Sequence, residues 1–527
     1  MKLLTVSQMR AVEGQADASG LSYEQMMENA GRGLAEIIQE EYDDLTDEGI
    51  LALVGKGNNG GDALVALACL AENGWRCTAY LAAGRPNDPL VARLRAAGGE
   101  ILLAGVATAA ELLPDAIVSH PLLLDGFLGT GIQLPLRGTI QSLLSNIQAQ
   151  IADLPAPPTV IAVDCPSGLD CDTGEVAPET LSADLTVTMA AAKPGFYRFP
   201  GADFLGEVQL SEIGSLEGLP AWQEVTRFVV DEETVAEMLP ARPRDAHKGT
   251  FGTVLVVAGS VHYPGAAMLS GKAAYRVGAG LVTLAVPRPV QPMLAGHFPE
   301  ATWLPLPEEE GFLAADAADV LRANVQRATC LLFGPGFGLH ETTRHFLARF
   351  VTPELPPLVL DADGLKLFAQ LPGWPLRLPP WSILTPHPGE MSLLTGLDTR
   401  TLQSDRVQHA ERFAKEWGHI VIFKGAFTIV AAPDGQTALI PIATSALARA
   451  GTGDVLAGMI AGLRAQGLPA FDAAVAGAWL HGQAGLHAEN VLGNSAAVLA
   501  GDVLEGVKEV MGRLSGKVRY TSAMRSV

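Results

Sequence analysis

The sequence has little positive charge, no long apolar run and no apolar leader. Its 527 residues include 36 Lys and Arg against 57 Asp and Glu, which gives a formal net charge of −21. This balance argues against a nucleic-acid or anionic-membrane partner, and it means that an anionic ligand must be held by local N–H groups and a few cations. No run of about 18 apolar residues could span a membrane. Residues 1–10 contain no apolar signal core.

Cysteine is also scarce. The five cysteines (Cys69, Cys77, Cys165, Cys171 and Cys330) form no CxxC pair and are odd in number. This pattern argues against a zinc site or a disulfide framework and fits a reducing compartment. We therefore expect a cytoplasmic protein, and we expect it to form a homo-oligomer.

What the chain does have is length, apolar residues and many turns. With 48% hydrophobic residues it can bury a large core, and its length suggests about two to four domains. The 57 glycines and 35 prolines are spread along the chain, which favours many tight βα turns over a low-complexity segment. A Gly- and Pro-containing stretch at 214–220 separates two α/β series, so we predict domains at 1–220 and 221–527.

The first series contains a phosphate-binding type of βα unit. Residues 50–54 form an apolar run, 55–62 read Gly-Lys-Gly-Asn-Asn-Gly-Gly-Asp, and a helix is predicted over 63–72. The loop matches neither the GxGxxG fingerprint nor a Walker A loop. Its amide and carboxylate oxygens, beside N–H donors, suit a hard cation or sugar hydroxyls.

Two further strands of this half end in acids. Residues 122–124 lead to Asp125, and residues 160–163 lead to Asp164 and Ser167. Because ligands bind at the carboxyl ends of parallel strands, we expect Asn59, Asp125, Asp164 and Ser167 to converge. A run at 185–189, predicted as the final strand of this half, ends near Lys193. That lysine is either a cation at the same edge or a solvated surface charge.

The second half repeats this pattern. Its apolar runs are 253–257, 330–333, 358–360, 383–385 and 420–423, and the polar loops that follow begin near Gly259, Gly334, Asp361, Pro386 and Lys424. His387, Glu390 and Lys424 could singly be a turn histidine, a helix-start acid and a strand-end charge. Together they outline a nucleotide site with an acceptor pocket beside it.

The stretch from Gly451 to Asp454 completes this second site. An amphipathic helix follows it, with Val455, Leu456, Met459, Ile460 and Leu463 at helical spacing. Small residues at a helix N-terminus allow a phosphate to approach unpaired N–H groups. Asp454 could then take a proton from a hydroxyl beside the phosphate. On these residues alone, an ordinary N-cap aspartate is an equal alternative.

These loops resemble two known enzyme families. Gly451-Thr452-Gly453-Asp454, Lys424-Gly425, His387-Pro388-Gly389-Glu390 and Gly334-Pro335-Gly336 resemble the ADP/ATP-dependent NAD(P)H-hydrate dehydratases, which have a ribokinase-like fold. Asn58-Asn59-Gly60-Gly61-Asp62, Asp125 and the 164–168 segment resemble the NAD(P)H-hydrate epimerases, which have a Rossmann-like fold. In this order they resemble the bacterial bifunctional NAD(P)H-hydrate repair enzymes. The fold class implied is α/β, with an N-terminal Rossmann-like α/β/α domain and a C-terminal ribokinase-like α/β domain.

The resemblance implies roles for individual residues. In the first site Asp164 would face the damaged nicotinamide ring, and Asn59, Asp125 and Ser167 would bind potassium. In the second site Asp454 would be catalytic, Ala266, Gly336, His387 and Asp454 would border the hydrate, and Mg²⁺ would offset phosphate charge. The epimerase substrate residues would be Asn58, Asn59, Gly60, Gly61, Asp62, Gly129, Thr130, Gly131, Ile132, Gln133, Leu134, Pro135 and Asp164. The adenine nucleotide would be held by Lys424, Gly425, Ala426, Phe427, Thr428 and Gly453.

The implied activity is metabolite repair by an isomerase and a lyase on one chain. The first domain would interconvert the R and S hydrates of NADH and NADPH, and the second would dehydrate the S form using ADP or ATP. Three positions depart from the family pattern: Ala63 replaces a usual glycine, Lys56 a common proline and Cys165 an aliphatic residue. Two alternatives remain open, a kinase of a small alcohol and a first half that binds ligand without catalysis.

Overall fold

The computed structural model describes residues 1–104 and 107–524. The chain divides into two compact units, Met1–Arg227 and Phe228–Val527. The segment 214–220, predicted as a linker, lies inside the first unit, because Leu216 and Val225 are buried in that unit's core. No helix in the described ranges is long and apolar enough to cross a membrane.

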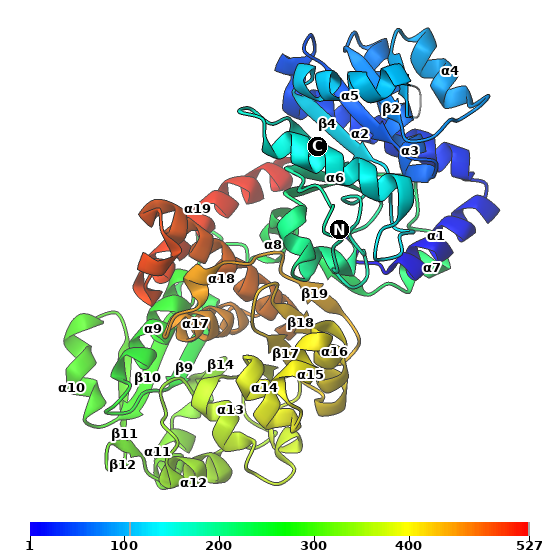
Figure 1. Ribbon diagram of the computed structural model, residues 1–527. Helices are drawn as coiled ribbons and strands as arrows, with labels where there is room; N and C mark the ends of the chain where they lie inside the picture. Colours follow the sequence, from blue (N-terminus) through cyan, green and yellow to red (C-terminus); the bar gives the residue numbers. More distant parts are fainter. Residues whose placement is uncertain (105–106, 525–527) are drawn as a thin grey trace. The chain divides into compact units, whose positions relative to one another are not determined.

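The first unit, coloured from blue to green in Figure 1, is built on a parallel sheet. The strand order of this sheet is β3-β2-β1-β4-β5-β6-β7. Its strands are β1 (Ile50–Val54), β2 (Cys77–Leu81), β3 (Glu100–Leu103), β4 (Leu122–Gly126), β5 (Thr159–Val163), β6 (Leu185–Met189) and β7 (Glu207–Ser211). The prediction that 185–189 is the last strand was wrong. β7 follows it at the sheet edge, where its Glu207 and Gln209 give it no continuous apolar run.

Helices cover both faces of this sheet. Their bounds are α1 (Val6–Ala18), α2 (Tyr23–Tyr42), α3 (Asn58–Glu72), α4 (Pro89–Ala96), α5 (Ala107–Ser119), α6 (Gly138–Ala152) and α7 (Pro220–Gln223). Alternate residues of β1 face opposite ways, as the period of a strand requires. Ile50, Ala52 and Val54 share a core with α1–α4, whereas Leu51 and Leu53 share another with α5 and α6.

The helix predicted to begin at Ala63 begins instead at Asn58. The Asn-Asn-Gly-Gly-Asp segment is therefore its first turn, not a loop. Glycine is required there by packing: a Cβ on Gly60 would lie 2.2 Å from the Gly55 carbonyl oxygen. The low helix propensity of this segment is outweighed by close contact with the preceding strand end.

The second unit is built on a ten-stranded sheet of order β11-β10-β9-β14-β15-β16-β17-β18-β19-β8. In this sheet order, neighbouring strands from β11 through β17 pair in parallel. Strands β18 and β19 are added at the end of this series in antiparallel pairing. The bounds are β8 (Arg227–Val229), β9 (Thr253–Val257), β10 (Leu281–Pro287), β11 (Thr302–Leu306), β14 (Cys330–Phe333), β15 (Leu358–Leu360), β16 (Ile383–Leu384), β17 (Ile420–Phe423), β18 (Ile429–Ala431) and β19 (Thr437–Leu439). A separate hairpin joins β12 (Glu308–Glu309) to β13 (Phe312–Leu313).

Helices again cover both faces. One core contains residues of α8 (Glu232–Met238), α9 (Pro264–Arg276), α10 (Val290–Leu294), α17 (Thr452–Ala465), α18 (Ala470–Leu492) and α19 (Ala500–Met524). The other contains residues of α11 (Ala317–Arg322), α12 (Glu341–Phe350), α13 (Ala362–Phe368), α14 (Pro388–Thr395), α15 (Thr399–Ser404) and α16 (Arg406–Trp417). The α/β class predicted for both halves is confirmed.

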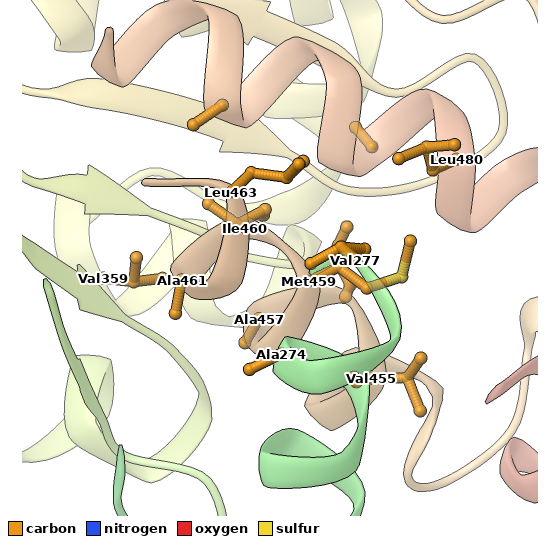
Figure 2. Close-up of a cluster of buried hydrophobic side chains, with 14 of the residues drawn as sticks. Ala274, Val277, Val359, Val455, Ala457, Met459, Ile460, Ala461, Leu463 and Leu480 are labelled. Carbon is orange, nitrogen blue, oxygen red and sulfur yellow. The ribbon is translucent and has the colours of Figure 1, made fainter. Parts of the chain in front are cut away.

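Helix α17 is the central helix of this unit. The predicted apolar positions are buried, and Val455, Met459 and Ile460 lie among side chains of α9 and α18 (Figure 2). Glycine permits the close approach, since a Cβ on Gly458 would lie 2.2 Å from the carbonyl oxygen of Ser270 on α9. This packing fixes the N-terminus of α17, where the Gly-Thr-Gly-Asp motif lies.

Candidate functional sites

A cavity of about 880 Å³ opens at the carboxyl ends of β1 and β4. The chain leaves β1 towards β2 and leaves β4 towards β5, on opposite sides, so this is the point where ligands bind in open α/β sheets. Eight of the predicted substrate residues line it: Asn58, Asn59, Asp62, Gly129, Thr130, Gly131, Ile132 and Asp164. Gly60, Gly61, Gln133, Leu134 and Pro135 are not among its lining residues.

Asp164 follows β5 and is held in a constrained conformation. Its φ is +62°, in the left-handed region that few side chains adopt. The Met189 backbone N–H donates to its Oδ1 at 2.9 Å, and the buried Lys193 ammonium donates to the same oxygen. Lys193 also donates to Thr188 Oγ1 at 2.6 Å. A strained acid fixed by a buried cation, with its carboxylate on a cavity, fits a reactive group.

Lys193 was predicted only as a cation near this edge, and it is a full member of the site. A second residue that the sequence pattern did not indicate is Glu13 of α1, which lines the same cavity. Burial and the nearby Asp164 charge raise the pKa of Glu13 and raise that of Asp62 much further. The shift favours the protonated form of Asp62, which can donate a hydrogen bond to a ligand.

Asp125 and Ser167 lie beneath this cavity and are fully buried. Ser167 donates to Asp125 from its hydroxyl at 2.6 Å and from its backbone N–H at 2.8 Å. The Asn59 amide donates to the Leu128 carbonyl at 2.9 Å, next to the Leu128 N–H that donates to Ser167 Oγ at 2.8 Å. The three residues thus belong to one hydrogen-bonded cluster.

Among the described residues, no cationic side chain is found to act on Asp125 of this cluster. Burial raises the pKa of Asp125, and the groups that oppose the shift are hydrogen bonds from Ser167 and Phe127, not cations. A buried carboxylate with hydroxyl, amide and carbonyl oxygens around it is a donor set that suits a hard cation. Ala63 does not disturb it, because its methyl faces Gly126 and lies outside the cavity lining.

The second unit brings its polar loops together at the corresponding edge of its own sheet. Lys424, after β17, donates to Asp361 Oδ1, after β15, at 2.9 Å, and its ammonium lies 3.8 Å from Glu390 Oε2. Thr385, after β16, donates to the same Asp361 oxygen at 2.5 Å. Burial alone would lower the pKa of Lys424, but the Asp361 and Glu390 carboxylates outweigh it and raise that pKa.

Asp454 lies in the first turn of α17, whose N-cap is Gly451 with φ +91°. It is therefore not the N-cap aspartate of the alternative interpretation. Gly453 lies next to the ion pair between Lys424 and Asp361, since a Cβ on Gly453 would be 3.6 Å from Lys424 Nζ. Burial, together with the Asp361 charge, raises the pKa of Asp454 to about 7, although Lys424 opposes the shift. A carboxylate with this pKa is suited to take a proton at physiological pH.

The residues predicted to border the hydrate lie on the adjoining loops. A Cβ on Gly336 would be 2.8 Å from the Ala266 methyl and 3.0 Å from Tyr263 Cβ, so these three residues are in contact. His387 caps α14 by accepting from the Gly389 N–H at 3.0 Å, and its Nε2 is 3.3 Å from Glu390 Oε1. Burial lowers the pKa of His387.

The predicted nucleotide loop, from Lys424 to Thr428, is held by the backbone and by an arginine. Thr428 Oγ1 donates to the Gly425 carbonyl at 2.9 Å, and the Phe427 N–H donates to Ile442 O at 3.0 Å. Arg406 of α16 donates to the carbonyls of Phe423 and Ala426. The loop is thus preformed beside Lys424.

Two residues of this second site escape sequence reasoning in different ways. Asp361 was named as the start of a polar loop but was given no role, although it follows a strand as Asp164 does and the same signal could have assigned it to the site. His481 of α18 is buried against the Thr452 carbonyl, and burial lowers its pKa to about 4, which leaves the imidazole neutral. Nothing in its local sequence predicts that it reaches the N-terminus of α17.

Comparison with known proteins matches both halves. The family model described as NAD(P)H-hydrate dehydratase matches residues 254–507, and the one described as YjeF-related protein N-terminus matches residues 23–195. A solved ADP/ATP-dependent NAD(P)H-hydrate dehydratase from Bacillus subtilis, co-crystallized with ATP/Mg²⁺, is 33% identical, with a TM-score of 0.47 over 54% of this chain and 97% of its own.

Full-length relatives share one name, bifunctional NAD(P)H-hydrate repair enzyme. The relative from Moorella thermoacetica is 36% identical over 94% of this chain and 93% of its own. Those from Salinibacter ruber and Escherichia coli are 37% and 32% identical, over 98% and 89% of this chain and 97% and 86% of their own. With both family models in this order on one chain, the protein belongs to the family of bifunctional NAD(P)H-hydrate repair enzymes.

Proposed function

We propose that the first unit interconverts the R and S hydrates of NADH and NADPH, and that the second unit dehydrates the S form at the expense of ADP or ATP. The observation that carries the proposal is that each unit holds its own polar site at the strand ends of its own sheet. The family assignment favours this function over a small-alcohol kinase.

In the second site Asp454 is the general base. Hydroxide is a poor leaving group, so the hydroxyl of the hydrate must first be converted into a better one. Asp454 takes the hydroxyl proton as the oxygen attacks the terminal phosphoryl group of the nucleotide, and the bond from that phosphorus to its bridging oxygen breaks, so that the nucleotide leaves with one phosphate fewer. The C–O bond then breaks, phosphate leaves, and loss of a proton from the adjacent carbon restores the reduced nicotinamide.

The cationic and small residues around Asp454 bind the nucleotide. Lys424 places its charge beside the phosphates, and the loop to Thr428 together with Gly453 supplies backbone N–H groups. No set of three or more His, Cys, Asp or Glu groups that could hold a metal occurs in the described part of the chain. Mg²⁺ is usually bound by one or two carboxylates and the substrate phosphates, and it would neutralise phosphate charge when bound.

In the first site Asp164 contacts the hydrated nicotinamide ring. The Lys193 ammonium holds its carboxylate in a fixed direction, so that it can accept a proton from the hydroxyl of the hydrate. Asp62 lines the same cavity, and its protonated form would donate a hydrogen bond to the hydrate. Asn59, Asp125 and Ser167 would hold potassium, which supplies the positive charge that the buried Asp125 lacks.

One experiment separates this proposal from its alternatives. A mixture of R and S hydrate is incubated with the protein and ADP, ATP or neither, and the recovery of reduced-nicotinamide absorbance is followed. We expect complete recovery with nucleotide and none without it. A stable phosphorylated product would favour the kinase. Recovery of the S fraction alone, over and above the spontaneous rate of epimerisation, would favour a non-catalytic first unit.

A further inference from the structure

The cavity of the first unit contains cationic side chains that the proposed chemistry does not use. Arg10 of α1, Lys56 after β1 and Arg137 before α6 all line it and are exposed. Within the described residues, none of these three has a hydrogen bond or an ion pair with another side chain. Arg85, near the same loop, differs: it is paired with Asp88 and donates to the Gly55 carbonyl at 2.7 Å.

The cavity also holds charged groups that act on one another. Glu13 and Asp62 lie close enough to Asp164 and Lys193 for those charges to shift their pKa values, and Arg10 acts on Glu13 in the same way. Lys56 and Arg137 come from loops after β1 and β4, and Arg10 lies one helical turn before Glu13. In a chain of net charge −21, three cations that line one cavity without an ion pair among the described residues need a reason.

We infer that Arg10, Lys56 and Arg137 together bind the phosphate groups of the dinucleotide hydrate. The inference rests on the proposed function of the first unit. A dinucleotide hydrate carries its uncharged reacting ring at one end and its phosphates several bonds away. When the reacting ring is bound at Asp164, the phosphates therefore lie away from Asp164 and can be bound by the three cations.

These residues act on substrate binding and not on the chemical step. Guanidinium groups bind phosphate through paired, charge-assisted hydrogen bonds, and an ammonium adds a point charge. Each contact is the same for substrate and transition state, so it lowers KM and leaves kcat unchanged. Two phosphate positions are open to them: the pyrophosphate that both hydrates share, and the 2′-phosphate of NADPH hydrate alone.

The test uses the full chain and the variants Arg10→Gln, Lys56→Gln and Arg137→Gln, singly and combined. Epimerisation of NADH hydrate and NADPH hydrate is measured at constant potassium, with choline chloride to vary ionic strength. We expect each substitution to raise KM about three- to tenfold with kcat nearly constant, and the triple variant to lose most of the salt dependence of kcat/KM. An equal rise for both hydrates assigns the pyrophosphate, and a larger rise for NADPH hydrate assigns the 2′-phosphate.

Arg95→Gln is the matched control, because Arg95 is an exposed arginine of α4 outside the cavity lining. The dehydratase activity of each variant, measured in the same sample, reports on the integrity of the chain. An unchanged KM in the triple variant, or an equal rise in KM for Arg95→Gln, overturns the inference. Wild-type epimerisation is measured first, so a failure of the proposed function is seen separately.

Discussion

Asp454 shows how burial prepares a single carboxyl for catalysis. It stands in the first turn of α17 with Asp361 and Asp363 nearby, and these charges and its burial raise its pKa to about 7. Near neutral pH about half of the molecules then carry the ionised base. A helix N-terminus normally favours an anion, so burial and the neighbouring carboxylates prevail here.

Replacement of Asp454 by Asn keeps the shape of the turn but removes the base. We expect dehydration to slow about 100-fold or more, with nucleotide binding retained. In the wild-type protein kcat should rise with pH to a plateau, with a midpoint near 7 set by this group. Steady-state rates from pH 5.5 to 9 check both expectations, and near-normal turnover of Asp454→Asn would exclude the role.

The same substitution should stabilise the second unit. The folded pKa of Asp454 lies near 7 and the ordinary value is 3.8, so between these pH values only the folded state holds the proton. The contribution of this group to stability therefore falls as pH rises from about 4 to 7, and above 7 the full cost of a buried charge is present. Asp454→Asn should raise the melting temperature by about a few °C at pH 8 and by progressively less towards pH 4. A gain that does not depend on pH would contradict this account.

At the scale of elements, much of both sites could be predicted because parallel sheets gather their strand ends at one edge. Asp125, Asp164 and Lys424 each follow a short apolar run, and that signal is local. Glu13 and His481 lie on helices whose approach to the sites depends on sheet order and helix packing, which no local pattern encodes. The start of α3 was misplaced because glycines with low helix propensity are held in the helix by contacts with Gly55.

The loops after β4 and β5 and the start of α3 are connected through Asp125, Ser167 and Asn59, so one ion would fix all three. We expect Asp125→Ala to weaken hydrate binding and epimerisation and to leave dehydration unchanged. Replacement of potassium by sodium should act in the same direction, since a preformed cage contracts poorly around a smaller ion.

Thermal melts distinguish an ion site from a structural hydrogen bond at Asp125. If the cluster binds potassium, the ion raises the melting temperature of the first unit in the wild type but not in Asp125→Ala. If Asp125 serves only to accept bonds from Ser167, its loss lowers the melting temperature equally in either salt. An equal potassium shift in both proteins would show that the ion binds elsewhere.

At the scale of the molecule, each unit carries its own sheet, its own cores and its own site. The two activities therefore do not need a shared residue, although the product of one is the substrate of the other. We expect isolated Met1–Arg227 to epimerise hydrates without nucleotide, and isolated Phe228–Val527 to consume only the S form.

The end point of the first fragment should decide whether it folds. Val225 is buried in the first core, Lys2 donates to its carbonyl at 3.0 Å, and the Leu3 N–H donates to the Arg227 carbonyl at 3.0 Å. A fragment ending at Pro220 loses these contacts and α7, so its N-terminal segment keeps the pairing with Ala192 but loses the partners that lie after Pro220. We expect the fragment 1–227 to melt cooperatively and epimerise a pure R sample, and the fragment 1–220 to melt several °C lower, since loss of buried apolar contacts costs a few kcal/mol. Circular dichroism melts with the epimerase assay measure both. If the two fragments are equally stable, the segment after Pro220 is a linker, and if the longer one folds but leaves the R form unchanged, the first unit binds its ligand without catalysis.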